Sequence, residues 1–343
     1  MLKSKITSTA LYLPQPDKTD LTMPRTVKVT AASRLHFGMF SFSQPDVRAF
    51  GGVGVMIDRP GVCLTVQSAD KLTATGPLAD RALQFAQRLT QAWSLPSEPA
   101  CEIRIETCCR DHTGLGVGTQ LALAVASGMS RFLDRPEVDA VELARLVGRG
   151  RRSAVGTYGF MHGGLIVEAG KPSAESAEFS TLVSAMALPE SWRFVLACPT
   201  TDEGLHGNEE TVAFEKLPPV PRQTTDELCR LALLVMIPAA SDASFEIFRE
   251  ALYRYGVLAG SCFSSQQGGP FASKRTSQLV ETIRGLGIAG VGQSSWGPTV
   301  FALVRDPSQA NRLVEQLRGL SGGADLELTV AAPSNHAARI ETI

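Results

Sequence analysis

The stretch that decides the fold reads Gly114-Leu115-Gly116-Val117-Gly118-Thr119-Gln120 and continues into Leu121-Ala122-Leu123-Ala124-Val125-Ala126. Alternating glycines free the backbone to turn its N–H groups toward one point. The apolar run is typical of a helix buried on all sides, whose positive end faces the same point. We expect this glycine loop (residues 114–120) to bind phosphate through Gly114, Gly116, Gly118, Thr119 and Gln120. A plain turn at a helix start is the alternative.

The glycine loop matches neither of two common nucleotide-binding motifs. It lacks the Lys-Ser/Thr ending of a P-loop, and its glycine spacing differs from GxGxxG. A P-loop triphosphatase and a Rossmann cofactor site are therefore not implied.

Length and composition narrow the class of protein. A chain of 343 residues is longer than those that usually fold around a single hydrophobic core, which predicts two packed domains. The 33 basic and 34 acidic residues nearly cancel, so no charge excess indicates a nucleic-acid partner. Seven cysteines, with Cys108 and Cys109 adjacent, fit a reducing compartment better than a disulfide framework. With no signal-peptide pattern and no apolar run of membrane-spanning length, we expect a cytoplasmic protein without a membrane segment.

Strand and helix patterns occur in both halves of the chain, which predicts an α+β fold. The expected strands are 27–32 continuing over 34–40, 55–58, 62–66, 103–107, 165–167, 192–197, 300–304 and 325–331. The expected helices are 81–92, 121–126, 138–147, 225–236, 244–253, 278–286 and 309–317. We divide the chain into a loose arm (1–25), an N-terminal phosphate-binding domain (26–188) and a C-terminal domain (189–343).

Several short segments in a fixed order resemble those of the GHMP kinases, the small-molecule kinases that include galactokinase, homoserine kinase and mevalonate kinase. These segments are 33–38, 50–54, 112–122, 148–153, 162–167 and 292–298. The resemblance implies a two-domain GHMP kinase-like fold, with an N-terminal lobe like a domain of a ribosomal protein and a ferredoxin-like C-terminal lobe.

Within this superfamily the sequence looks most like the β-ribofuranosylaminobenzene (ribofuranosylhydroxybenzene) 5'-phosphate synthases of tetrahydromethanopterin biosynthesis. Two departures from the kinase pattern favour that family. Val117 stands where the kinases usually carry serine, and the C-terminal turn reads Gln293-Ser294-Ser295-Trp296 instead of a glycine run.

The resemblance implies a decarboxylating transfer from phosphoribosyl pyrophosphate to 4-hydroxybenzoate or 4-aminobenzoate. The products are a C-riboside 5'-phosphate, carbon dioxide and pyrophosphate. Departure of pyrophosphate leaves positive charge on the ribose, so the site must hold the leaving group, usually with Mg²⁺, and exclude water. Mg²⁺ is the expected cofactor. Its candidate ligands are Asp202, Glu203, Glu209 and Glu210.

Arginines are the natural partners for the 5'-phosphate and the benzoate carboxylate. The arginine loop (residues 148–153) offers Arg149, Arg151 and Arg152 together with Ser153. A solvated helix end is the alternative for this loop. Arg34 is a further binding candidate, although a surface position is equally compatible with its strand pattern.

A base that takes the phenol or aniline proton would help the ring attack. The candidates are His112, His162, His206 and Glu209, and the last two lie in a polar segment, 204–210, that also reads as a plain surface loop. His36 shares a strand face with Arg34 and is another catalytic candidate. A hydrogen-bonded core histidine is its alternative.

The C-terminal turn supplies the expected aromatic pocket through Ser294, Ser295 and Trp296, with a core position as the alternative for the tryptophan. We also weigh an ATP-dependent kinase and a non-catalytic ligand sensor, which the fold alone does not exclude. A homodimer is compatible with a soluble enzyme of this size.

Overall fold

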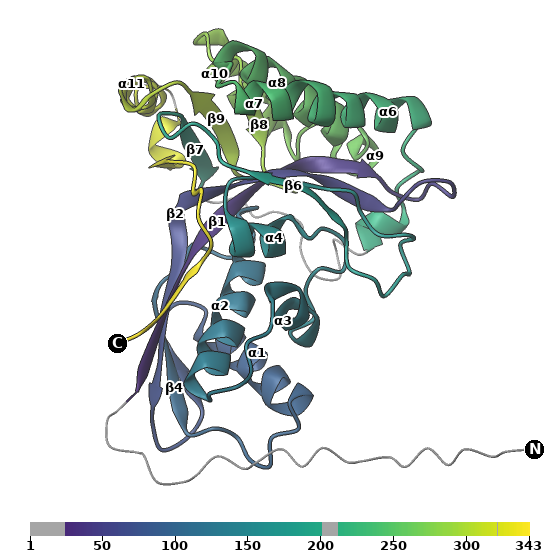
Figure 1. Cartoon of the computed structure of the whole chain (residues 1–343). Helices are drawn as coiled ribbons and strands as arrows, with labels where there is room; N and C mark the ends of the chain where they lie inside the picture. The colour runs from purple at the N-terminus through teal and green to yellow at the C-terminus, as the bar shows by residue number, and fades with distance from the viewer. Residues whose placement is uncertain (1–24, 201–211, 321) are drawn as a thin grey trace, which may run out of the picture.

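The computed structural model of this chain describes residues 25–200, 212–320 and 322–343, and its strands form two sheets (Figure 1). The first sheet runs in the order β11-β1-β2-β4-β3, with β5 added to β2 and β6 added to β5. Its strands are β1 (Thr26–Ser41), β2 (Phe50–Ser68), β3 (Thr73–Thr75), β4 (Cys101–Thr107), β5 (Leu165–Glu168), β6 (Leu182–Met186) and β11 (Arg339–Thr342). Helices belonging to this half are α1 (Ala79–Ala92), α2 (Val117–Phe132), α3 (Ala140–Leu146) and α4 (Val155–His162).

The second sheet is antiparallel, in the order β10-β7-β9-β8, and carries helices on one face (Figure 1). Its strands are β7 (Arg193–Pro199), β8 (Val291–Gln293), β9 (Val300–Val304) and β10 (Leu326–Ala331). The helices are α6 (Arg222–Leu231), α7 (Ile237–Ser241), α8 (Phe245–Ser261), α9 (Ser264–Gln267), α10 (Lys274–Gly285) and α11 (Pro307–Arg318). Sheets with helices in both halves confirm the expected α+β class.

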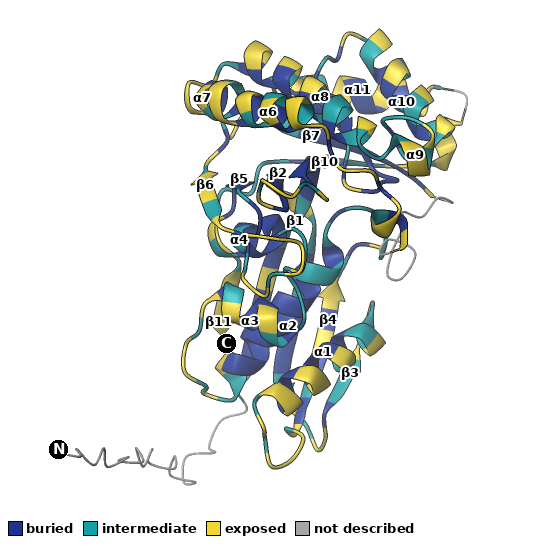
Figure 2. Ribbon diagram, turned by 90° about the vertical axis from the view of Figure 1, so that its right-hand side faces the viewer, coloured by how far each residue is buried: buried dark blue, intermediate teal, exposed yellow. Residues whose placement is uncertain are grey.

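Helix α2 is the buried centre of the first half, as its sequence predicts. Every residue from Leu121 to Ala126 is fully buried, and Figure 2 shows the helix dark blue against the sheet. Gly128 lets the helix approach closely, since a Cβ there would lie 2.9 Å from Cγ2 of Val66. This packing fixes the helix N-terminus, and therefore the glycine loop, against a rigid sheet.

Some elements differ from those expected. Residues 55–58 and 62–66 belong to one strand, β2, although Pro60 lies between them. Pro60 falls where β2 does not pair with β1, so its missing N–H removes no hydrogen bond between the two strands. Helix α4 was not expected, because Gly156 and Gly159 weaken the helical pattern. Gly159 packs against the side chain of Met56 instead.

The last strand, β11, lies beside the first, β1, pairing Val27 with Thr342 and Thr30 with Arg339. The second sheet is therefore formed by chain that leaves the first sheet after β6 and returns to it at β11. The boundary placed at residue 188 falls between β6 and β7, whereas the C-terminal residues complete the first sheet. Among the described residues, no helix has both the length and the apolar character needed to cross a membrane.

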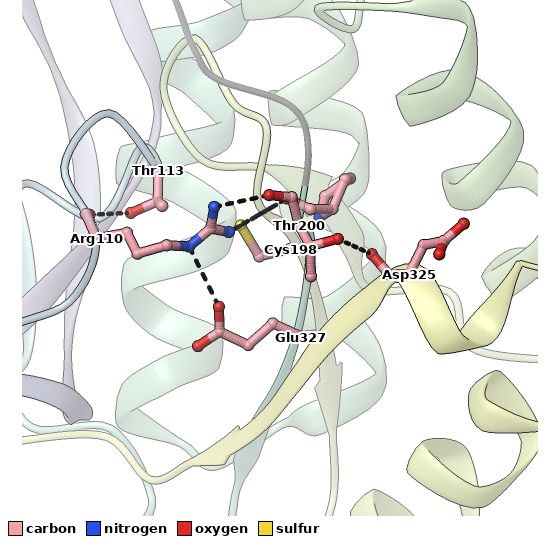
Figure 3. A network of polar contacts seen from close by, with 7 residues as sticks. Arg110, Thr113, Cys198, Thr200, Asp325 and Glu327 are labelled. Atoms are coloured by element: carbon pink, nitrogen blue, oxygen red, sulfur yellow. Dashed lines mark hydrogen bonds and ion pairs between the residues drawn. The ribbon is translucent and has the colours of Figure 1, made fainter.

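Arg110 joins the two halves just ahead of the glycine loop (Figure 3). Its guanidinium donates to the carbonyl oxygens of Thr200 at 3.0 Å and Pro199 at 3.2 Å, and it lies 3.4 Å from a carboxylate oxygen of Glu327. Its own carbonyl accepts from the hydroxyl of Thr113 at 3.0 Å. The segment that enters the glycine loop is thus fastened to β7 and β10.

We expect Arg110→Ala to lower the melting temperature by about 2 °C, because lost hydrogen bonds to half-exposed groups cost about 1 kcal/mol. Thermal unfolding followed by circular dichroism measures this. Arg104→Ala, which removes an exposed ion pair with Glu102 within the first half, is the matched control. Equal melting temperatures for the two variants would contradict a joining role for Arg110.

Candidate active site

A cavity of about 650 Å³ lies where the two halves of the chain meet. The glycine loop and the arginine loop line it from the first half, and α8 and the turn after β8 line it from the second. Most of the predicted site residues face this one space: Arg34, His36, His112, Gly114, Gly116, Gly118, Thr119, Arg149, Arg151, Arg152, Ser153, Ser295 and Trp296.

The glycine loop has backbone geometry that its glycines make possible. Gly114 and Gly116 adopt φ values of 81° and 71°, in the left-handed region that other residues rarely occupy. Gly116 is also the N-cap of α2, which has no side-chain cap, so the first N–H groups of the helix end at the cavity. This is the arrangement that binds an anion at a helix N-terminus.

Ser294 connects three segments that are distant in sequence. Its hydroxyl donates to the carbonyl of Gly114 at 2.7 Å and accepts from the N–H of His36 at 3.0 Å. The N–H of Ser295 donates to the carbonyl of His36 at 3.0 Å, and that of Arg34 donates to the carbonyl of Leu115 at 3.0 Å. β1, the glycine loop and the turn after β8 therefore form one unit.

The cavity is strongly cationic. Six arginines line it, namely Arg34, Arg81, Arg88, Arg149, Arg151 and Arg152, whereas Asp111 is the only carboxylate among the lining residues that the structure describes. Asp111 forms an ion pair with Arg81. Such an excess of guanidinium groups suits a ligand that carries several negative charges.

Two of these arginines lie at the glycine loop. A Cβ added to Gly118 would fall 3.3 Å from Nη2 of Arg149 and closer still to the guanidinium of Arg81. Arg149 also stacks over Phe85 of α1, 5.0 Å from the ring centroid, which orients its planar group. The N-terminus of α2 and these guanidiniums thus face one part of the cavity. A merely solvated helix end would not place Arg149 there.

Another part of the cavity wall is aromatic. Phe214, Phe263 and Trp296 lie edge to face, with ring centroids 4.8 Å apart for Phe263 and Trp296 and 5.6 Å for Phe214 and Trp296. Arg152 lies over Phe214 at 4.5 Å from its centroid, so a cation stands beside these rings. Trp296 belongs to a hydrophobic cluster and lines the cavity as well. Trp296 is therefore both a core residue and part of the cavity wall.

His36 lines the cavity but is almost fully buried, and both ring nitrogens have partners inside the protein. Nδ1 accepts from the N–H of Gly38 at 3.2 Å, and Nε2 lies 3.0 Å from the hydroxyl of Ser153. Burial, and secondly the charge of Arg34, lower its pKa well below the ordinary value, so the ring is neutral at physiological pH.

Three predicted site residues do not line the cavity. Gln120 is buried one turn into α2, where its side-chain amide donates to the carbonyl of Gly156 at 2.8 Å. The hydroxyl of Ser294 is engaged in its hydrogen bonds with Gly114 and His36. His162 is exposed at the C-terminal end of α4, while the cavity receives the arginine loop that precedes this helix. Glu209, His206 and the acidic magnesium candidates lie outside the described residues.

Other lining residues were not expected from the sequence. Arg81 and Arg88 look like ordinary polar positions of helix α1, and Phe214 and Phe263 look like core residues. Only the folded chain brings them together with the glycine loop. Glu168, which contacts Ser153 but does not line the cavity, was also not expected. Its one signal in the sequence is a charged residue at the end of an otherwise apolar buried strand.

The described residues hold no group of three or more His, Cys, Asp or Glu side chains that would cage a metal ion. Mg²⁺, however, usually binds one or two carboxylates and completes its shell with water and substrate phosphates. Asp111 is the one carboxylate among the described lining residues, and it is already paired with Arg81.

Family models of known proteins match both halves of the chain. The family described as "GHMP kinases N terminal domain" matches residues 78–164, and "GHMP kinases C terminal" matches residues 236–320. Mevalonate pyrophosphate decarboxylase from Streptococcus pyogenes has a similar fold, with a TM-score of 0.66 and 12% identity over 92% of this chain and 98% of that one.

Two curated relatives are similar along nearly their whole length, and both are named β-ribofuranosylphenol 5'-phosphate synthase. The protein from Archaeoglobus fulgidus is 29% identical, with 85% of this chain and 91% of the relative covered. The protein from Methanothermobacter thermautotrophicus is 26% identical, covering 85% and 93%. The chain therefore belongs to the GHMP kinase superfamily, and within it the chain is similar to the β-ribofuranosylphenol 5'-phosphate synthases.

Proposed function

We propose that this chain transfers the ribose 5-phosphate group of phosphoribosyl pyrophosphate to a 4-substituted benzoate, releasing pyrophosphate and carbon dioxide. One observation carries the proposal: a single cavity joins a strongly cationic end at the glycine loop to an aromatic end that holds Arg152. The donor carries a phosphate and a pyrophosphate, and the acceptor carries a carboxylate on an aromatic ring. Each end matches one of the two substrates.

The glycine loop, Arg81 and Arg149 hold the pyrophosphate of the donor. Its bond to C1 of the ribose breaks as negative charge moves onto the departing oxygen. Backbone N–H groups and guanidiniums that are already in place stabilise that charge without reorganising. Asp111, the one carboxylate among the described lining residues, would bind an accompanying Mg²⁺, which would neutralise part of the pyrophosphate charge.

The aromatic end holds the acceptor ring against the cluster of Phe214, Phe263 and Trp296, and Arg152 orients its carboxylate. The ring carbon that bears the carboxylate forms the new bond to C1. The bond to the carboxylate carbon then breaks, its electron pair returns to the ring, and carbon dioxide leaves. The aromatic walls, in which Trp296 is buried and Phe214 and Phe263 are partly buried, keep water from reaching C1 before the ring does.

We expect Trp296→Leu to raise KM for the benzoate about 2- to 10-fold and to leave KM for phosphoribosyl pyrophosphate unchanged. An aromatic pair contributes about 0.5–1.5 kcal/mol beyond its buried area, which corresponds to that range. Steady-state kinetics with each substrate varied in turn measures both constants. Trp93→Leu, at the end of α1 and away from the cavity, is the control, and equal effects of the two substitutions would contradict this placement of the ring.

The function itself is tested by incubating purified protein with Mg²⁺, phosphoribosyl pyrophosphate and carboxyl-labelled 4-hydroxybenzoate or 4-aminobenzoate. Labelled carbon dioxide should appear together with pyrophosphate, and only when both substrates are present. Retention of the label under every condition, with ADP formed from ATP instead, would show a kinase and refute the proposal.

A further inference from the structure

A chain of hydrogen bonds runs from the cavity wall into the protein interior. His36 faces the cavity from β1, and its Nε2 atom lies 3.0 Å from the hydroxyl oxygen of Ser153 in the arginine loop. That hydroxyl lies 2.7 Å from a carboxylate oxygen of Glu168 at the end of β5. β1 and the arginine loop are therefore connected, through the Ser153 hydroxyl, to the buried carboxylate at the end of β5.

The direction of each hydrogen bond follows from the backbone. The N–H of Gly38 donates to Nδ1 of His36 at 3.2 Å, so Nδ1 carries no proton in the neutral ring. The ring proton is then on Nε2, which donates to the Ser153 hydroxyl. The hydroxyl in turn donates to Glu168, because its lone pairs accept from His36 and from the N–H of Val155 at 3.2 Å.

Glu168 also fixes the chain that follows the arginine loop. Both of its carboxylate oxygens lie 2.9 Å from the N–H of Ala154, the N-cap of α4. Nearby, the ammonium group of Lys171 donates to the carbonyl of Arg151 at 3.2 Å. The loop that presents the arginines is thus held from behind at two points, by side chains that do not line the cavity.

The carboxylate is in an unfavourable place for a charge. Glu168 is fully buried, and burial raises its pKa although hydrogen bonds from Ser153 and Ala154 oppose the shift. Above that raised pKa the ionised form opposes folding, since the unfolded chain would hydrate it. A buried charge of this kind beside a ligand cavity is more typical of a functional site than of a stabilising contact.

We propose that Glu168 is a positioning residue that acts through Ser153, holding His36 as its Nε2–H tautomer and holding the arginine loop in the orientation that binds substrate. Glu168 touches neither substrate. It determines where the Ser153 hydroxyl points, and that hydroxyl determines the orientation of the imidazole on the cavity wall. This role rests on the proposed function only in its kinetic consequences, since the hydrogen-bond chain exists without substrate.

The first test compares Glu168→Gln, Ser153→Ala and the double variant by steady-state kinetics. We expect each single substitution to lower kcat about 10-fold, while KM for the benzoate changes less than about 3-fold. The double variant should lose no more than the worse single one, because both changes break the same chain. Ser153→Thr keeps the hydroxyl and should recover most of kcat, and Glu250→Gln on the exposed face of α8 is the control.

The second test needs no substrate. Nitrogen-15 NMR of histidine-labelled protein distinguishes a protonated from an unprotonated ring nitrogen, and the chain has five histidines. We expect one ring, absent from the His36→Gln spectrum, to show a protonated Nε2 and an unprotonated Nδ1. The nitrogen shifts of that ring should change in Glu168→Gln and stay unchanged in Glu250→Gln.

These tests separate the possible outcomes. Unchanged His36 shifts in Glu168→Gln, or additive losses in the double variant, would overturn the positioning role. A Glu168→Gln protein with a lower melting temperature but an unaltered kcat per folded molecule would show a purely structural residue and also overturn it. If the wild-type protein releases no carbon dioxide from either benzoate, the proposed function fails, whereas the NMR comparison still decides the role of Glu168.

Discussion

Gly116→Val is expected to abolish measurable transfer activity, with a loss of more than about 100-fold in kcat/KM for phosphoribosyl pyrophosphate, while the protein stays folded. Gly116 has a φ of 71°, and a Cβ there would lie 2.9 Å from Cγ of Arg34. Valine is strained in this conformation by about 1–3 kcal/mol, so the loop relaxes and its N–H groups turn away from the anion. A misplacement of this kind at a binding loop costs about 100-fold in rate.

Titration calorimetry with inorganic pyrophosphate measures the binding directly, and circular dichroism verifies the fold. Gly285→Val is the matched control, because this glycine ends helix α10 on the surface with open space around it. Gly285→Val should bind pyrophosphate like the wild-type protein. Normal binding by Gly116→Val would mean that the glycine loop does not hold the leaving group.

Arg149→Met should weaken binding of the donor about 10- to 100-fold and leave the benzoate constant nearly unchanged. A hydrogen bond to a charged group contributes about 1.5–3 kcal/mol, which converts to that range. Methionine keeps an apolar stem for the contact with Phe85 and removes the guanidinium that stands at Gly118. The KM for phosphoribosyl pyrophosphate and the dissociation constant for pyrophosphate should rise together.

Arg145→Met, on the exposed surface of α3 a few residues earlier, serves as the control for a general loss of positive charge. Its binding constants should match those of the wild-type protein. A rise confined to the benzoate constant in Arg149→Met would move this arginine to the acceptor end and contradict the assignment made above.

The features that the sequence predicted well are those that depend on neighbouring residues. Three glycines followed by an apolar run predict the loop and the buried helix α2, because backbone freedom and hydrophobic burial are local properties. The family resemblance extended this to the whole fold. Placing the arginine loop near the glycine loop needed only that resemblance and the charge of the substrates.

The remaining features depend on contacts between distant segments. Phe214 and Trp296 are far apart in sequence, and they meet only after the second half of the chain has folded. Gln120 was expected at the anion, but α2 turns its side chain toward Gly156. Glu168 was passed over because the strand pattern ended at Val167, and nothing local shows that a carboxylate there meets Ser153.

The return of β11 to β1 has a consequence for how the protein is made. Residues 26–188 are synthesised before residues 189–343, yet β11, which pairs with β1 on the side away from β2, belongs to the later part. The hydroxyl of Ser294, which fixes the carbonyl of Gly114, also arrives late. In a chain that folds from its N-terminus, the carbonyl of Gly114 therefore lacks the Ser294 hydrogen bond until the second sheet has formed, so the glycine loop is completed by the later half of the chain.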